Sequence, residues 1–430
     1  MTMRLAISAT LVLLALSRAA GAEVLIRWDL PSVPSPQALG ISTVVIPAAQ
    51  EQGIKQALAQ GYRVLVEIDA AKAEAFSPIE GIAGVVVKGT IAADLREQLA
   101  QRVKVVRVAD DRGKWPHIRT NWVTRNNDVL QVTNRSSQPW LENNAALIAI
   151  AAERLREGER TLLTYPWQPV TVADLDRGPR LDNYLIAIAE AGSFGADLLL
   201  PLHERFERAL LAGAPDERAE WIELRRSIDF YAWSVSLPRQ AIANVAVVTG
   251  DPMRDFELLN LLARHNLPFV VVPPAKVTSE RLAGIELLIV LDELDPAAKQ
   301  RVQEFAASAR GRTARVVERA GVPADPNASA LQMRRLLGAD RRVVDIWNGI
   351  TVLIAPYSRP ESGDVVLTVV NYAAQPLPVQ IRLRGSFSEV QYEAPGEQIM
   401  RLPFEVKNGG TEFVLPAIRV GARVFLKRSP

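Results

Sequence analysis

The chain has 430 residues, enough for two or three domains, with 50 Lys and Arg residues against 48 Asp and Glu residues. These charges are interspersed, so they form neither the basic stripe of a nucleic-acid-binding protein nor a polybasic membrane patch. The sequence contains no cysteine, which excludes thiol catalysis and cysteine-ligated metals. His117, His203 and His265 are too scattered to form a zinc set, so we expect neither a metal nor a cofactor.

The N-terminus predicts export. Arg4 precedes an apolar run at residues 5–16, and the small residues 19–22 follow, which is the anatomy of a secretory signal peptide cleaved after Ala22. The run is shorter than the roughly 20 apolar residues that cross a bilayer. We therefore expect a secreted or periplasmic protein whose residues 1–22 are removed and whose mature part has no stable membrane insertion.

Residues 23–235 alternate short β-branched runs with longer stretches of helical period. This alternation indicates βα units around a parallel sheet whose strands are buried on both faces. The eight candidate strands are residues 24–28, 43–47, 63–68, 84–87, 104–108, 128–133, 161–165 and 196–202. The candidate helices are residues 51–60, 92–101, 140–157, 181–191 and 214–233. Eight strands in about 210 residues predict an α/β fold, a (β/α)8 TIM-like barrel, with a doubly wound open sheet as the alternative.

A second α/β unit is predicted at residues 243–320, as a small flavodoxin-like domain. Its candidate strands are residues 244–249, 268–273 and 285–291, and its candidate helices are residues 253–265 and 296–307. The turn at residues 249–252 lacks the spaced glycines of a dinucleotide site. We therefore expect no nucleotide there.

The composition changes after a connector at residues 321–329. Residues 340–430 contain short alternating apolar runs punctuated by Pro and Gly. These runs cover residues 350–355, 365–371, 379–384, 388–392, 411–415 and 424–427. They predict a C-terminal antiparallel β-sandwich.

The order of these parts resembles the multidomain glycoside hydrolases of the β-galactosidase type, which carry a trimerisation domain. The second unit has the closest likeness, at residues 244–248, in the helix before His265, and at residues 287–291 before an acidic stretch. The resemblance implies an amidotransferase-like domain without its catalytic cysteine and a carbohydrate ligand, and it leaves a homo-oligomer open. In that family an Asn-Glu pair ends the fourth barrel strand, whereas Lys88 and Gly89 stand there in this sequence. No catalytic residue can therefore be carried over.

Candidate catalytic acids come from the ends of neighbouring strands, where barrel enzymes place their functional groups. Glu67 or Asp69 on the third strand, with Asp110 or Asp111 after the fifth, is the pair we predict. A glycosidase needs two carboxyl groups about 5 to 5.5 Å apart if it is retaining, or about 6.5 to 9.5 Å apart if it is inverting. The structural alternatives are a buried carboxylate at Glu67 or Asp69 satisfied by Lys88 or Arg107, and an Asx turn at Asp110 or Asp111.

Groups suited to sugars follow several strand ends. Indole faces offer apolar contact to sugar C–H groups, and charged side chains make strong hydrogen bonds to hydroxyl pairs. The predicted substrate-binding residues are Trp28, Asp29, Lys88, Arg112, Trp115, His117, Arg119, Asn134, Arg135, Trp140, Tyr165, Trp167 and His203. A structural hydrogen bond at His117 and a helix start at His203 are the alternatives.

Two functions remain open from the sequence. The first is an exported glycoside hydrolase that acts on an oligosaccharide or polysaccharide through paired carboxylates. The second is a non-catalytic carbohydrate-binding or assembly protein on a degenerate hydrolase barrel. Inward carboxyl groups that are free favour the enzyme, whereas carboxyl groups bound by Arg or Lys favour the binding protein.

Overall fold

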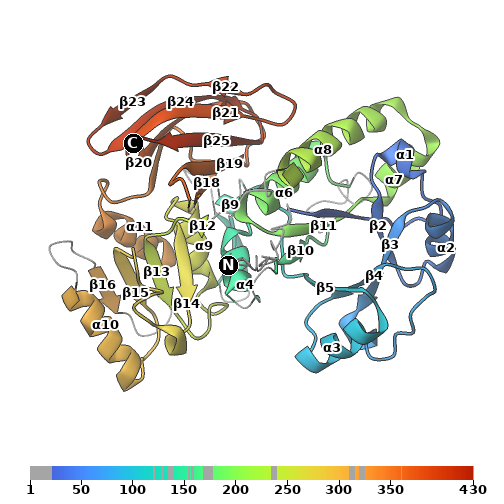
Figure 1. The fold of residues 1–430 in the computed structure, drawn as a ribbon, viewed down its shortest axis with the longest axis horizontal. Coiled ribbons are helices and arrows are strands. Elements are labelled where there is room, and N and C mark those ends of the chain that lie inside the picture. Colours follow the sequence, from blue (N-terminus) through green and yellow to red (C-terminus); the bar gives the residue numbers. More distant parts are fainter. Residues whose placement is uncertain are drawn as a thin grey trace, which may run out of the picture.

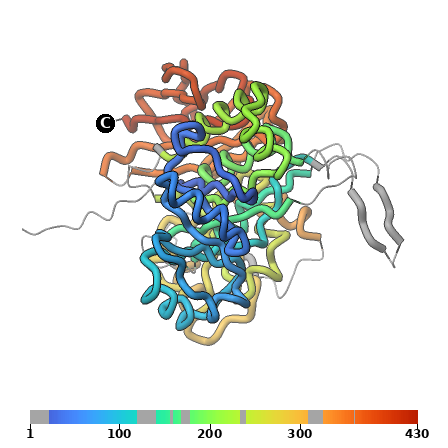
Figure 2. The backbone as a smooth tube through the Cα atoms, turned by 90° about the vertical axis from the view of Figure 1, so that its right-hand side faces the viewer, coloured from blue at the N-terminus to red at the C-terminus, as the bar shows by residue number. Residues whose placement is uncertain are grey.

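The computed structural model describes residues 22–119, 122–126, 129–133, 140–153, 155, 159–167, 178–233, 240–308, 315–318, 325–359 and 361–429. The predicted signal peptide lies outside these residues except for Ala22. A barrel, a small α/β unit and a β-sandwich follow one another along the chain (Figure 1). In Figure 2 the first strands and helices of the barrel face the viewer, and the sandwich lies at the top.

Seven parallel strands close the barrel within the described residues, in the order β1-β11-β10-β5-β4-β3-β2. They are β1 (Val24–Arg27), β2 (Thr43–Pro47), β3 (Arg63–Asp69), β4 (Gly84–Lys88), β5 (Val105–Asp110), β10 (Leu162–Thr164) and β11 (Asp197–Pro201). The helices around them are α1 (Pro36–Leu39), α2 (Glu51–Ala59), the 3-10 helix η1 (Ala70–Lys72), α3 (Ala93–Arg102), α4 (Ala145–Ala152), α6 (Leu181–Phe194), α7 (Glu204–Ala212) and α8 (Pro215–Trp233). The β-branched runs form strands because one face meets these helices and the other fills the barrel.

The predicted sixth strand, residues 128–133, is not a barrel strand, which corrects the (β/α)8 prediction. β8 (Val129–Thr133) pairs antiparallel with β7 (Trp122–Asn126) in a separate two-stranded sheet. β5 pairs directly with β10, with Ala109 opposite Leu162. This direct pairing closes the ring, so it leaves no place for a strand between β5 and β10. The predicted helix at residues 140–157 likewise begins with a strand, β9 (Trp140–Glu142), which pairs with β6 (His117–Arg119).

The inside of the barrel is filled in layers by residues that alternate along each strand. One apolar residue from each strand forms the middle inner layer, which comprises Leu25, Val45, Leu65, Val86, Ala109, Leu162 and Leu199. At the amino ends of the strands, the Arg107 guanidinium lies 3.0 Å from Glu23 and 2.5 Å from Asp197. These ion pairs close the barrel at the amino ends of its strands. The candidate site lies at the opposite end, because barrel proteins place their functional groups at the carboxyl ends of the strands.

The small α/β unit contains a parallel sheet in the order β14-β13-β15-β16. Its elements are β13 (Val245–Val248), α9 (Phe256–Arg264), β14 (Phe269–Val272), the 3-10 helix η2 (Pro274–Lys276), β15 (Leu287–Val290), α10 (Pro296–Ser308), β16 (Arg315–Glu318) and α11 (Pro326–Leu337). α11 occupies part of the predicted connector: the Asp325 side chain accepts a hydrogen bond from the Ala328 N–H, and Pro326 starts the helix. Met333 and Leu337 then pack into the core of this unit.

Two antiparallel sheets form the C-terminal sandwich, in the orders β12-β18-β19-β25-β21-β22 and β17-β20-β24-β23. The strands are β12 (Gln240–Ala241), β17 (Val344–Trp347), β18 (Val352–Ser358), β19 (Val365–Asn371), β20 (Leu377–Arg384), β21 (Phe387–Glu393), β22 (Met400–Arg401), β23 (Phe404–Lys407), β24 (Gly410–Ile418) and β25 (Gly421–Arg428). Alternating side chains from both inner faces form one apolar core. None of the helices in the described ranges is both long and apolar enough for a membrane span.

Candidate functional site

Three charged residues occupy the inner face of the barrel at the carboxyl ends of its strands. Arg27, Glu67 and Lys88 each lie two residues beyond a member of the middle inner layer, and a step of two along a strand returns to the same face. The Arg27 Nε atom lies 2.9 Å from a carboxylate oxygen of Glu67, whose side chain is 9% exposed. Since β2 lies between β1 and β3, this ion pair crosses the inner face of an intervening strand.

Asp29 and Glu207 add two carboxyl groups beside this ion pair. Asp29 also forms an ion pair with Arg27. Glu207, which is fully buried, accepts hydrogen bonds from the backbone N–H groups of Asp29 and Leu30 at 2.8 and 3.0 Å. α7 carries Glu207 to this place because it follows β11, the strand that pairs with β1. Burial raises the pKa of Asp29, and it raises the pKa of Glu207 to about 8.

The predicted catalytic acids do not form one group. Glu67 is bound by Arg27 rather than by Lys88 or Arg107, the partners considered from the sequence. Asp69 lies at the end of β3 with its side chain 60% exposed, 4.0 Å from Lys72. This exposure makes Asp69 a surface carboxylate.

Asp110 lies on the outer side of its strand end, and Asp111 follows directly after β5. Ala109 belongs to the middle inner layer, so the next residue, Asp110, faces the other side of β5. Asp110 forms an ion pair with Arg112 and accepts the Arg112 backbone N–H at 3.0 Å, which is the Asx-type contact of the structural alternative. Asp110, Asp111 and Arg112 line a cavity of about 370 Å³ together with Gly89 and Thr90. Glu67 and Asp110 therefore point to different sides of the barrel wall.

The predicted aromatic residues form a packed cluster. The Trp115 ring lies 5.9 Å from Tyr165, 5.7 Å from Trp167 and 5.5 Å from Tyr184, measured between ring centroids. Trp115 and Tyr165 are buried, and so is Trp28, whose indole donates to the Ser32 carbonyl oxygen. Trp167 is partly exposed, so it is the member of this cluster that meets solvent.

Three of the remaining predicted binding residues, His117, His203 and Trp140, have structural contacts. His117 Nδ1 lies 2.7 Å from the Trp115 carbonyl oxygen, and His203 caps α7 by accepting the Arg205 N–H at 3.3 Å. The Arg264 guanidinium lies over the Trp140 ring, 4.7 Å from its centroid. The side chains of Arg119, Asn134 and Arg135 lie outside the described residues. Lys88 faces the mouth, as described above, and the binding roles of all these residues stay predictions.

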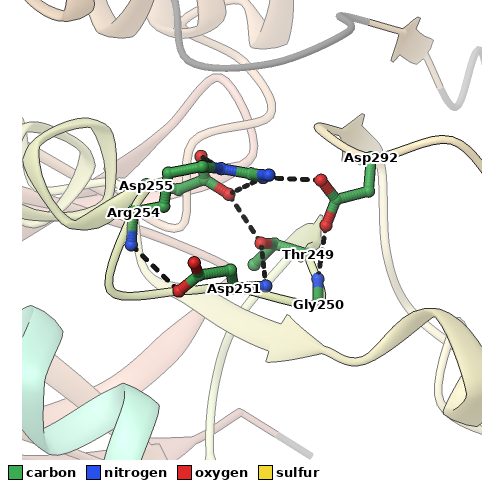
Figure 3. A network of polar contacts seen from close by, with 6 residues as sticks. All are labelled: Thr249, Gly250, Asp251, Arg254, Asp255 and Asp292. Atoms are coloured by element: carbon green, nitrogen blue, oxygen red, sulfur yellow. Dashed lines mark hydrogen bonds and ion pairs between the residues drawn. The ribbon is translucent and has the colours of Figure 1, made fainter.

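A second polar cluster lies at the carboxyl ends of β13 and β15 in the small α/β unit (Figure 3). The Asp292 carboxylate accepts the Gly250 N–H at 2.6 Å and pairs with Arg254 at 2.6 Å. The Thr249 hydroxyl donates to Asp255 at 2.6 Å, and Arg254 also pairs with Asp255 at 2.8 Å. Open α/β sheets bind ligands where the strand order reverses, as it does between β13 and β15. Here the chain's own carboxylate takes the glycine N–H that a phosphate would take.

Sequence reasoning missed Arg27 and Glu207. Arg27 had only a partial signal: it lies near the end of a predicted strand, and its inward direction follows from Leu25, whose place in the inner layer only the structure shows. Glu207 had none, since its contacts with residues 29 and 30 join positions 178 and 177 apart in the chain. The helical periodicity of the sequence shows that residue 207 can face the barrel. It does not show which backbone N–H groups the side chain binds.

Comparisons with known proteins give a likeness of fold. No protein-family model and no curated protein matches the sequence. Alpha-L-fucosidase isoenzyme 2 from Paenibacillus thiaminolyticus matches with a TM-score of 0.59 and 10% identity, covering 95% of this chain and 100% of that one. A rhamnosidase from Novosphingobium sp. PP1Y matches with a TM-score of 0.43 and 11% identity, covering 88% of this chain and 38% of that one. The chain therefore has a glycoside hydrolase-like fold, which confirms the predicted resemblance at the level of fold. The β-galactosidase type stays a prediction.

Proposed function

We propose that the mouth of the barrel binds a carbohydrate without cleaving it. The supporting observation is that Arg27 forms ion pairs with both Asp29 and Glu67, the inward carboxylates nearest the mouth. A retaining or inverting glycosidase uses one protonated carboxyl group and one free carboxylate. A carboxylate held by a guanidinium would have to break that pair before it could attack a sugar or activate a water molecule.

The same groups suit sugar recognition. Arg27, Asp29, Glu67 and Lys88 present charged donors and acceptors side by side, and such groups bind neighbouring hydroxyl pairs through charge-assisted hydrogen bonds. The partly exposed Trp167 adds an apolar ring near the strand ends. The glycoside hydrolase-like fold supports a carbohydrate as the class of ligand, although a fold alone does not establish a function.

The test is calorimetric titration of the full chain with a panel of oligosaccharides, with release of reducing ends measured in the same samples. We expect binding without turnover. Arg27→Ala should weaken binding about tenfold or more, because it removes a charged donor and leaves two carboxylates unpaired. Arg63→Ala is the matched control, since Arg63 lies exposed at the opposite end of β3 and should leave affinity unchanged. Absence of binding to every glycan would refute the proposal.

Hydrolysis is the second candidate, and the raised pKa of Asp29 favours it. Burial keeps the Asp29 carboxyl group protonated to higher pH, which suits a proton donor. The measurement is reducing-end release by the full chain, by Asp29→Asn and by a Glu67→Gln, Asp110→Asn double variant. Turnover abolished in both variants would establish the enzyme and replace the binding proposal. Turnover abolished in the double variant alone would assign catalysis to the acids predicted from the sequence.

Export is proposed on the N-terminal sequence pattern alone. The chain expressed with residues 1–22 in a bacterium should appear in the periplasm or medium with a mass that starts at Glu23. Replacing Leu13 and Leu14 by Arg should interrupt the apolar run and retain the unprocessed chain in the cytoplasm. An unprocessed chain in the wild type would contradict this proposal.

A further inference from the structure

β23 is a free edge strand that exposes apolar side chains. It is the last strand of the four-stranded sheet of the sandwich, paired with β24 alone among the described strands (Figure 1). All four of its residues are exposed, with Phe404 at 37% and Val406 at 45%. Met400, just before it on edge strand β22, is 42% exposed. Exposed apolar side chains on a free edge are the features by which sheets recruit another strand.

These apolar side chains lie on the core side of the sheet. Phe404 is opposite Phe413, and Val406 is opposite Thr411, and both opposite residues are buried. Residues directly opposite each other in a ladder share a face. Phe404 and Val406 therefore lie on the core side of β23, and both side chains are exposed to solvent.

The backbone of β23 is aligned to accept a further strand. Asn408 and Gly409 form its two-residue turn to β24 with φ of 50° and 71°, the geometry of a type I′ hairpin. The residues that flank such a turn, Lys407 and Gly410, form a hydrogen-bonded pair, and hydrogen-bonded and non-bonded pairs alternate along the ladder. Phe404 and Val406 consequently direct their N–H and C=O groups away from β24, toward the free edge.

The charges on β23 complement a second copy of the same strand. The Lys407 ammonium lies 3.2 Å from Glu405 and 3.0 Å from Glu412, so two carboxylates share one cation. In an antiparallel pairing with a two-fold axis at Val406, each Glu405 stands opposite Lys407 of the other copy. This register also pairs the outward N–H and C=O groups of Val406 with each other and places the charges at non-hydrogen-bonded positions, where side chains are closest.

We propose that a second copy of this chain binds along β23, forming an antiparallel, two-fold symmetric edge pair centred on Val406. The pair joins the two four-stranded sheets into one sheet and covers Phe404 and Val406. In a two-fold symmetric pair, the same surface of each copy forms the interface, so the free N–H and C=O groups of both edges are hydrogen-bonded at once.

The test is sedimentation velocity of the full chain from about 1 to about 200 μM, a range that spans the affinity of a small interface. We expect a monomer–dimer equilibrium with a dissociation constant on the order of 10 μM. Glu405→Lys and Lys407→Glu each place like charges opposite one another and should raise that constant about tenfold. The Glu405→Lys, Lys407→Glu double variant exchanges the charges and should return it to within about threefold of the wild type.

The matched control is Val414→Lys. Val414 is 54% exposed on the neighbouring strand β24, and it alternates with buried Phe413, so it faces the outer side of the sheet. This variant should dimerise like the wild type. A wild type that stays monomeric throughout the range would overturn the proposal. A dimer that the single charge reversals do not weaken, or that the double variant does not restore, would also overturn it.

Discussion

At the scale of single residues, Glu207 is the group whose burial has the clearest consequence. Its carboxylate satisfies two backbone N–H groups of the loop that carries Asp29, while burial raises its pKa to about 8. A raised folded-state pKa gives stability that is complete below the ordinary value of 4.5 and is lost as the pH rises through about 8. We expect the free energy of unfolding to fall across this interval.

The Glu207→Gln variant tests this origin of the pH dependence. Glutamine has one carbonyl oxygen, so one of the two backbone N–H groups loses its acceptor, and the free energy of unfolding should fall by about 1 to 3 kcal/mol. Its decline between about pH 4.5 and about pH 8 should become shallower in chemical denaturation curves, because the titrating group is gone. Glu204→Gln is the control, since that side chain is 56% exposed. An unchanged pH profile in Glu207→Gln would contradict the assignment.

At the scale of elements, the contact between α6 and α8 depends on Gly192. A Cβ atom at this position would lie 2.4 Å from the Tyr231 ring, and Tyr231 is fully buried. Gly192→Ala should therefore lower the free energy of unfolding by about 1 to 3 kcal/mol, as overpacking of a core does. Gly53→Ala in α2 is the control, because the added Cβ finds its nearest atom at 3.4 Å. That change should be neutral or stabilising by up to about 1 kcal/mol, as measured by thermal unfolding.

At the scale of the whole molecule, Glu190 joins the barrel to the sandwich. This fully buried side chain on α6 accepts the Tyr372 hydroxyl of the sandwich at 2.7 Å, and the Tyr165 hydroxyl and Asn144 amide of the barrel at 3.2 and 2.6 Å. Burial raises the pKa of Glu190. The hydrogen-bond donors offset the free-energy cost of burying this carboxyl group. The structure around the candidate site thus depends on a residue from the last domain.

Tyr372→Phe should uncouple the two domains. The variant removes one hydrogen-bond donor to the buried Glu190 carboxyl group, which costs about 1 to 3 kcal/mol. Calorimetry should then separate the unfolding of the sandwich from that of the barrel, and protease should reach the junction sooner. Tyr62→Phe removes a hydrogen bond from the Tyr62 hydroxyl to the Pro34 carbonyl oxygen, both in the barrel domain. This variant should leave the coupling between barrel and sandwich unchanged. If both variants separate the unfolding of the barrel and the sandwich equally, Glu190 does not join the two domains.

The sequence by itself determined the kinds of element and much of their order. Buried β-branched runs predicted β1 to β5, because strands enclosed on both faces favour apolar side chains over most of their length. Alternating runs predicted most strands of the sandwich for the same local reason. The position of Arg27 near the end of a predicted strand follows from the same pattern, whereas its direction into the barrel follows from the structure.

Only the tertiary structure decided how many strands close the barrel and which charges meet. A strand in a hairpin and a strand in a barrel can have the same local pattern, so only the pairing of β5 with β10 and of β7 with β8 places residues 129–133 outside the barrel. The partners of Glu67 and Asp29 depend on which strand ends lie side by side. Burial of acids such as Glu207 and Glu190 depends on helices and a domain far away in the chain. Such contacts are long-range, and local propensity carries no information about them.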